Sequence, residues 1–144
     1  MIRAARSEDF GAIRRLYRQL QPEDPVVPDD AARSIFDTIL DTPGLTLLVL
    51  EADGVVVATT YLNVIPNMTR SASPYAVIEN VVVHESVRGT GFGKQIMEAT
   101  LQHAWNAGCY KAMLLTGSKD ARTHAFYRTC GFSRDAKTAY LARP

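Results

Sequence analysis

The hydrophobic positions in the first third of the chain follow a strand spacing and then a helix spacing. Residues 2–5 have the pattern of a short strand, and Ser7 is placed to cap a helix that follows. The apolar residues of that helix recur every three or four positions, which is typical of one buried helical face: Phe10, Ile13, Tyr17 and Leu20. The proline-rich stretch 21–28 ends this helix, and a second helix begins with Asp29 or Asp30 as its cap.

Longer apolar runs with strand character occupy the middle of the chain. The runs 46–52 and 55–65 flank an Asp-Gly pair, which is a strong signal for a two-residue hairpin turn. A polar loop over residues 66–74 then leads to a further strand over residues 75–84. The middle of the chain is therefore predicted to begin a sheet with antiparallel pairing.

The last third alternates helices and strands. Apolar positions from Phe92 onward predict a third helix that ends at an Ala-Gly pair, followed by a strand over residues 111–116. A fourth helix begins at Asp120 or a neighbour, and residues 132–141 form a last strand or hairpin. The order predicts one mixed α/β (α+β) domain that spans residues 1–144.

Composition narrows the class of protein. The chain has 144 residues, is 47% hydrophobic and carries a net charge of +1 from 16 basic and 15 acidic residues. Because these charges are mixed, we expect no nucleic-acid partner, and because Glu51 and Asp53 interrupt the longest apolar region, we expect no membrane span. The N-terminus lacks the apolar core of a signal peptide, and Cys109 and Cys130 have no metal spacing. We therefore expect reduced core cysteines in a cytoplasmic protein.

Residues 81–94 carry the most specific chemical signal. A valine run ends, and a helical pattern begins directly after three glycines at alternate positions: Gly89, Gly91 and Gly93. Glycine permits positive φ and close approach of a ligand, and a helix N-terminus attracts anions. A P-loop is excluded because Gln95 follows Lys94, and the dinucleotide motif is excluded because its sixth position is Lys94. The segment is predicted to bind a phosphate group of another kind.

The spacing Arg88-x-x-Gly91-x-Gly93 after a valine-rich strand resembles the pyrophosphate loop of the GNAT superfamily of acyl-CoA N-acyltransferases. Residues 122–132 are similar to the closing motif of that family, in which an aromatic-Tyr pair precedes Gly-Phe. The resemblance implies the GNAT fold, with four helices and a mixed central sheet of about six to seven strands. It also implies that strands four and five splay apart and admit CoA.

Within the superfamily, residues 77–132 resemble the glucosamine-6-phosphate N-acetyltransferases. The shared features are an acid before a triple-valine strand and a Cys-Tyr-Lys triplet that enters the next strand. Two positions depart from the pattern: Asn80 replaces a second acid, and Thr123 stands where an asparagine usually contacts CoA. The resemblance implies acetyl-CoA as cosubstrate and leaves an amino sugar phosphate as one candidate acceptor.

The candidate catalytic residues are Tyr127 and Glu79. The resemblance implies that Tyr127 protonates the departing CoA thiolate. Strand alternation places Glu79 on one face with Val81 and Val83, where it could accept a proton from the amine directly or through water. The alternative for Glu79 is an ion pair with an arginine, and the alternative for Tyr127 is simple packing.

The resemblance also implies a set of cofactor-binding residues. The backbone of the triple-valine strand would pair with the pantetheine arm, and an N–H group after its bulge would hold the oxyanion. The full set is Val81, Val82, Val83, Arg88, Gly89, Thr90, Gly91, Phe92, Gly93, Lys94, Ser118 and Tyr127. Three histidines without carboxylates at ligand spacing give no metal site.

These observations predict an N-acetyltransferase that moves the acetyl group of acetyl-CoA to a primary amine of a small molecule by direct attack in a ternary complex. One alternative acceptor is a protein N-terminus or lysine. An alternative from another class is a non-catalytic acyl-CoA sensor, which would not need Glu79 and Tyr127 together. The apolar C-terminal strand and the 66–74 loop are compatible with a homodimer.

Overall fold

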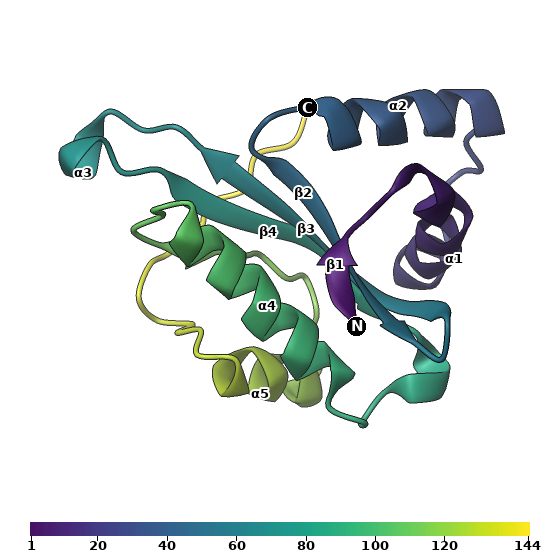
Figure 1. The fold of residues 1–144 in the computed structure, drawn as a ribbon. Coiled ribbons are helices and arrows are strands. Elements are labelled where there is room, and N and C mark those ends of the chain that lie inside the picture. The colour runs from purple at the N-terminus through teal and green to yellow at the C-terminus, as the bar shows by residue number, and fades with distance from the viewer.

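A twisted sheet lies between two layers of helices in the computed structural model, which describes residues 1–144 (Figure 1). Its strands lie in the order β1-β2-β3-β4-β5, antiparallel except for the last pair. The strand bounds are β1 Ile2–Ala4, β2 Leu45–Ala52, β3 Val55–Ile65, β4 Tyr75–Val83 and β5 Ala112–Met113. The five helices are α1 Phe10–Leu20, α2 Asp29–Asp41, α3 Thr69–Ala72, α4 Phe92–Asn106 and α5 Ala121–Thr129, with 3-10 turns η1 Ser7–Asp9 and η2 Glu85–Val87. The mixed α/β class is confirmed.

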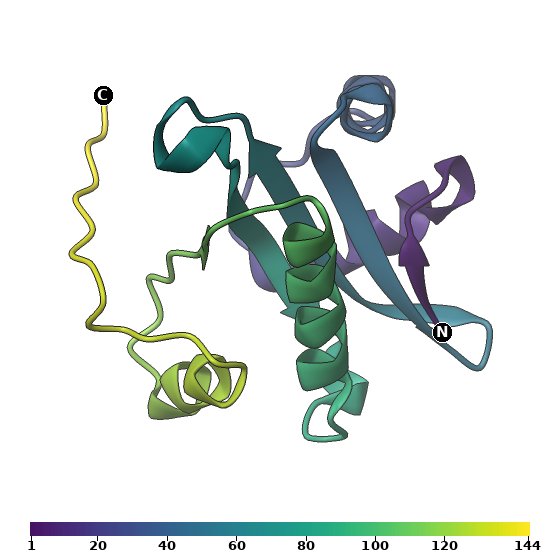
Figure 2. The ribbon, with the colours of Figure 1, turned by 60° about the vertical axis from the view of Figure 1, so that its left-hand side comes forward.

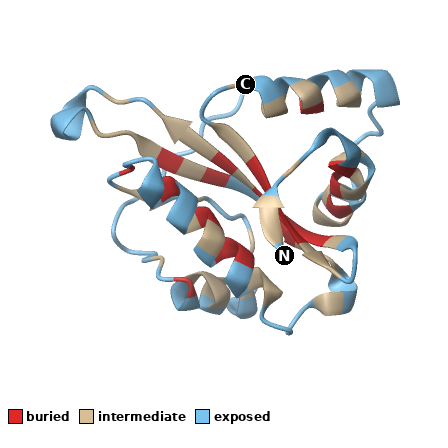
Figure 3. Cartoon of the chain, in the orientation of Figure 1, coloured by how far each residue is buried: buried red, intermediate tan, exposed pale blue.

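The two faces of the sheet have separate cores because alternate strand residues point to opposite sides. On one face, α1 and α2 cover Leu47 and Val49. On the other, α4 covers Leu62 and Ile78, and the C-terminal end of α5 adds the half-buried Phe126 and Tyr127. Figure 3 shows the buried residues along the centre of the sheet and the inward sides of α1 and α4. The sheet is thus a rigid platform whose two faces are both occupied.

Several elements differ from the sequence prediction. The sheet has five strands and not six to seven, since residues 132–141 form no strand and residues 133–144 are exposed. None of the backbone hydrogen bonds outside the helices and strands involves residues 133–144. Figure 2 shows this C-terminal segment running apart from the sheet. The expected strand 111–116 is reduced to β5, because β4 pairs with only two of its residues.

Smaller differences concern helix ends and the polar loop. Ser7 lies inside η1 and does not cap α1, because η1 precedes the helix and puts Asp9 at its N-cap position; the Asp9 carboxylate accepts the Arg6 N–H at 2.7 Å. Pro28, and not an aspartate, occupies the N-cap position of α2. The loop 66–74 contains the single exposed turn α3, which makes five helices and not four. No helix has the length and apolar content that crossing a membrane requires.

Candidate active site

The glycine loop joins β4 to α4 through two left-handed residues. Gly89 has φ +79° and Gly91 has φ +90°, a region that side chains with a Cβ rarely adopt. Gly91 is the N-cap of α4, and no side chain caps this helix. The first N–H groups of α4 therefore have no intrahelical partner and point out of the helix end, where an anion can bind them.

The side chains of the loop lie as follows. Arg88 is exposed, and its Nε donates to the Val83 carbonyl oxygen at 3.2 Å, so the guanidinium lies at the end of β4. Thr90 donates its hydroxyl to the Val87 carbonyl oxygen at 2.6 Å and closes the turn. Lys94 pairs with Glu98 at 3.6 Å on the exposed side of α4. The loop thus brings Arg88 to the glycines, whereas Lys94 already has a partner at the surface.

Gly93 connects the two sequence motifs. A Cβ on this residue would lie 3.1 Å from Cε2 of Phe126 and 3.4 Å from Cγ2 of Val83. The distance to Phe126 is shorter than an ordinary van der Waals contact, and the distance to Val83 is at the lower limit of one. The third glycine therefore lets α5 lie directly against the start of α4, which is a packing reason for glycine in addition to the predicted ligand contact.

A β-bulge changes the faces of β4. Asn80 has φ +49°, and the register with β3 shifts between the pairs Tyr61–Glu79 and Thr59–Val82. Val81 packs against the same cluster under α4 as Ile78. In β4, even-numbered residues therefore face α4 before the bulge, and odd-numbered residues face α4 after it. The prediction that Glu79 shares a face with Val81 and Val83 is therefore wrong. The extra residue breaks the alternation on which the prediction depended.

The bulge places Glu79 on the other face of the sheet. Its cross-strand partner Tyr61 packs with the α1–α2 cluster, and directly opposed residues share a face. Glu79 is exposed and forms no ion pair, with an arginine or any other cation. The carboxylate is thus free to act on a ligand, and the arginine alternative has no support in the structure.

Strands β4 and β5 pair only at their beginnings. The two cross-strand pairs are Ala76–Ala112 and Val77–Met113, after which β5 ends and β4 continues to Val83. The β5-side edge of the triple-valine segment 81–83 therefore has no neighbouring strand. An unpaired strand edge presents N–H and C=O groups that can pair with an extended ligand.

Tyr127 lies beside this open edge, in the last turn of α5. Its ring packs against Phe126 and Phe132, with centroid separations of 5.2 Å and 6.1 Å. Burial raises the pKa of the Tyr127 phenol above its usual value, and the nearby Cys130 and Glu79 raise it further. The phenol is thus fully protonated at neutral pH. Glu79 and Tyr127 form no direct contact: Glu79 lies on the α1–α2 face of the sheet, and Tyr127 packs on the α4–α5 face.

Ser118 and His124 are held by their own surroundings. The Ser118 hydroxyl accepts the Asp120 N–H at 3.1 Å and lies 3.3 Å from the Thr123 hydroxyl. The His124 Nε2 lies 2.8 Å from the Ser118 carbonyl oxygen. Asp120 caps α5, as predicted, by accepting the Arg122 N–H. Ser118 therefore orders the start of α5, and its contact with pantetheine stays a prediction.

Tyr17 is a candidate that the sequence did not reveal. The pattern placed it on the apolar face of α1, yet its hydroxyl is buried without a hydrogen-bond partner. Burial raises its pKa to about 12, while the nearby amide side chain of Asn80 acts in the opposite direction with a smaller effect. The signal in the sequence was a tyrosine on an apolar helical face where leucine or phenylalanine would pack equally well. Its free hydroxyl faces the bulge next to Glu79.

A cavity of about 700 Å³ opens beside Tyr127. Its walls are β5 with the residues after it, the side of α5 that carries His124, Tyr127 and Arg128, and the first part of the C-terminal segment. A hollow of about 660 Å³ on the opposite side of the molecule is lined by α2 alone, so it is an open surface without an enclosing wall. Of these two hollows, the one at Tyr127 is therefore the better candidate for a substrate site.

The Acetyltransferase (GNAT) family model matches residues 11–132. The chain belongs to the GNAT family. It is an acyl-CoA N-acyltransferase, and the resemblance seen in its two sequence motifs is confirmed.

Individual relatives agree with this assignment. A putative acetyltransferase from Agrobacterium tumefaciens has a solved structure that is 43% identical, with a TM-score of 0.95 over 100% of this chain and 99% of that one. The chain is 27% identical to an aminoglycoside N(6')-acetyltransferase of Stenotrophomonas maltophilia, over 99% of this chain and 92% of that protein. It is 32% identical to glucosamine 6-phosphate N-acetyltransferase 1 of Oryza sativa subsp. japonica, over 81% of this chain and 70% of that protein.

Proposed function

We propose that this GNAT enzyme transfers the acetyl group of acetyl-CoA to the primary amine of a small molecule, by direct attack in a ternary complex. The observation that carries the proposal is the open edge of β4 beyond the end of β5, which leads directly to the uncapped glycine loop at the start of α4. Two relatives named above are acetyltransferases of small amines, an aminoglycoside and glucosamine 6-phosphate.

Acetyl-CoA binds across the open end of the sheet in this proposal. Its pyrophosphate contacts the free N–H groups at the start of α4, with Arg88 as the counter-charge. Its pantetheine arm pairs with the free edge of residues 81–83, and the thioester lies near the bulge. An N–H group at the bulge, which β3 does not pair, then donates to the thioester oxygen as it becomes an oxyanion.

Two proton transfers accompany the reaction. A primary amine of pKa about 10.4 is protonated at neutral pH, so Glu79 accepts one proton from it, directly or through water. The amine nitrogen forms a bond to the acetyl carbon, and the bond between that carbon and the CoA sulfur breaks. Tyr127, which is protonated at neutral pH, donates its proton to the departing thiolate. The acetylated amine loses its remaining extra proton to water.

The test is release of CoA thiol from acetyl-CoA against a panel of amines, with product masses measured. The panel contains amino sugars with and without phosphate, aminoglycosides, polyamines, amino acids and a lysine peptide. We expect transfer to at least one small amine. Acetylation of the peptide alone would move the acceptor to proteins, and tight binding of acetyl-CoA without transfer to anything would indicate a sensor. Either result would overturn the proposal.

The Glu79→Gln variant tests the base. We expect kcat/KM to fall by about 100-fold at neutral pH, and by less at alkaline pH, where more of the amine is already deprotonated. Glu8→Gln, which removes an exposed carboxylate in η1 next to β1, at the other edge of the sheet from β4 and β5, serves as the matched control and keeps wild-type activity. An unchanged pH profile in Glu79→Gln would show that the carboxylate does not take the proton.

A further inference from the structure

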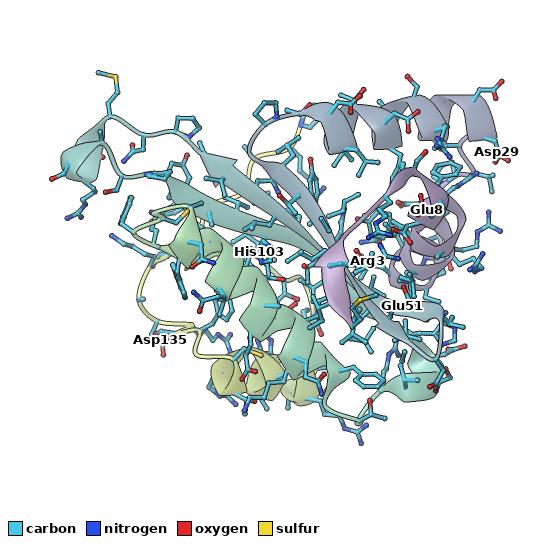
Figure 4. All side chains as sticks on the ribbon, viewed as in Figure 1. Arg3, Glu8, Asp29, Glu51, His103 and Asp135 are labelled. Atoms are coloured by element: carbon cyan, nitrogen blue, oxygen red, sulfur yellow. The ribbon has the colours of Figure 1, made fainter.

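The charged side chains that line the cavity at Tyr127 all carry the same sign. The cations come from three separate segments, before, within and after α5: Lys119, Arg128, Arg134 and Lys137. No aspartate or glutamate lines the cavity, and none of the four cations forms an ion pair. Asp135 lies on the same C-terminal segment (Figure 4) but is not part of the lining.

Such an arrangement favours an anionic ligand. Like charges around one hollow repel each other, and the potential inside a partly enclosed cavity is stronger than over an open surface. The rest of the chain does not share this bias, because its 16 basic and 15 acidic residues nearly balance. A ligand that brings negative charge relieves the repulsion, whereas a polycation increases it.

The cavity and the glycine loop are lined by different residues. Phe126 contacts the Gly93 position at the start of α4, while the following residues Tyr127 and Arg128 face the cavity. None of the loop residues 88–94 lines the cavity. The site proposed for the pyrophosphate of CoA, at the start of α4, is therefore separate from the lining of the cavity.

We propose that the cavity binds the phosphate group of the acceptor, so that the enzyme acetylates a small phosphorylated amine and discriminates against polycationic aminoglycosides. This inference rests on the proposed function and names its substrate class. Arg128 and Lys137 contact the phosphate, and the amine then lies next to Tyr127 and the acetyl group. The size of the cavity suits this role, since its volume of about 700 Å³ is within the range of sites that bind small molecules.

The experiment compares two acceptors that differ only by the phosphate, glucosamine and glucosamine 6-phosphate, together with one aminoglycoside. We expect kcat/KM to be at least about tenfold higher with the phosphate, because charge-assisted hydrogen bonds to it form in the complex. In the double variant Arg128→Gln/Lys137→Gln this advantage disappears, because kcat/KM falls more for glucosamine 6-phosphate than for glucosamine. Arg122→Gln, on the same helix but outside the cavity, keeps the advantage.

A second arm distinguishes the acceptor phosphate from the 3′-phosphate of CoA. If the cations bound CoA, the double variant would raise the KM for acetyl-CoA and would no longer distinguish acetyl-CoA from acetyl-dephospho-CoA. That result would overturn the inference, as would equal kcat/KM for the two sugars in the wild-type enzyme. An unchanged KM for acetyl-CoA in the double variant supports it.

A third arm keeps the inference testable if the proposed function fails. If no amine in the panel is acetylated, binding of glucose 6-phosphate, which lacks the amine, is measured by calorimetry with CoA present. Binding by the wild-type protein that is lost in the double variant supports a phosphate site in the cavity. No binding by the wild-type protein would overturn it, independently of the assay for acetyl transfer.

Discussion

Two regions of this molecule treat charge in opposite ways. At the N-terminal corner, the Arg3 guanidinium pairs with Asp9 at 2.7 Å and with Glu51 at 3.0 Å, which joins β1, η1 and β2 (Figure 4). Asp9 is only 5% exposed, and the guanidinium holds the pKa of its carboxyl below the ordinary value. At the far end, the four cations that line the cavity beside Tyr127 form no ion pair.

The difference separates charges that hold the fold from charges that await a ligand. A buried carboxylate is tolerated only when its hydrogen bonds and charge are satisfied, which Arg3 and the Arg6 N–H do for Asp9. Cations that surround a cavity without ion-pair partners do not by themselves stabilise the folded chain. Substitutions at the corner should therefore affect stability, and substitutions at the cavity end should affect catalysis.

The largest expected effect is on catalysis. Tyr127→Phe should lower kcat by about 100- to 1,000-fold, because the thiolate loses its proton donor, while the ring keeps its contacts with Phe126 and Phe132. Thermal unfolding should be nearly unchanged. Steady-state rates and calorimetry on the same preparation check both parts. Tyr110→Phe, which alters an exposed tyrosine beside Lys111, is the matched control with wild-type values.

Full activity in Tyr127→Phe at every pH would show that Tyr127 only packs. A large loss of stability together with activity would also break the comparison, because the phenol would then belong to the structural charges and not to the catalytic ones.

A smaller effect, confined to stability, is expected at the corner. Asp9→Asn should lower the free energy of unfolding by about 2–3 kcal/mol, because the Arg3 guanidinium loses its main charged partner in a poorly hydrated place. Denaturant unfolding measures this, and kcat/KM should not change. Asp37→Asn removes an exposed partner of Arg33 and should cost less than about 0.5 kcal/mol.

The pH dependence of the free energy of unfolding, measured for wild type and Asp9→Asn, gives an independent check. The folded-state pKa of Asp9 is lowered from an ordinary value of 3.8, so its stabilising contribution is complete above that value. It is lost as the pH falls through the lower folded-state pKa. The stability difference between wild type and Asp9→Asn should therefore be constant near neutrality and shrink below about pH 4. A difference that is independent of pH would show that the carboxylate charge is not what matters.

Features set by local sequence were the predictable part of the fold. The Asp-Gly hairpin turn forms as expected, with Asp53 and Gly54 both at positive φ. The helix α4 begins after Gly91 and ends before Gly108, whose φ is also positive. Each of these depends on the conformational range of one or two residues, which a sequence states directly.

Features set by pairing between distant segments were not predictable. The bulge at Asn80 depends on how β4 meets β3, and strand alternation alone put Glu79 on the wrong face. Whether residues 132–141 form a strand depends on whether the edge of β5 is long enough to pair with them. For the same reason, the glycine loop and Tyr127 came from contiguous motifs, while the cations of the cavity are brought together only by the fold.

The smallest expected effects concern two glycines of the loop before α4, Gly91 and Gly93, which we expect to differ in their importance for stability and for binding of acetyl-CoA. Gly91→Ala places a Cβ at φ +90°, which should cost about 1–2 kcal/mol of stability and raise the KM for acetyl-CoA, because the start of α4 shifts. Gly93→Ala has ordinary helical φ, and its Cβ would only press on Phe126 at 3.1 Å. Since alanine favours the helix, the net change in stability should stay below about 1 kcal/mol.

The KM values decide what Gly93 is for. If only packing against α5 requires glycine there, Gly93→Ala leaves the KM for acetyl-CoA unchanged, although a shift of α5 carries Tyr127 with it and reduces kcat slightly. If the pyrophosphate itself approaches Gly93, the KM for acetyl-CoA rises as it does in Gly91→Ala, even though the protein is hardly destabilised. The first result would place the border between structural and ligand-binding residues between Gly91 and Gly93, and the second would move it further along α4.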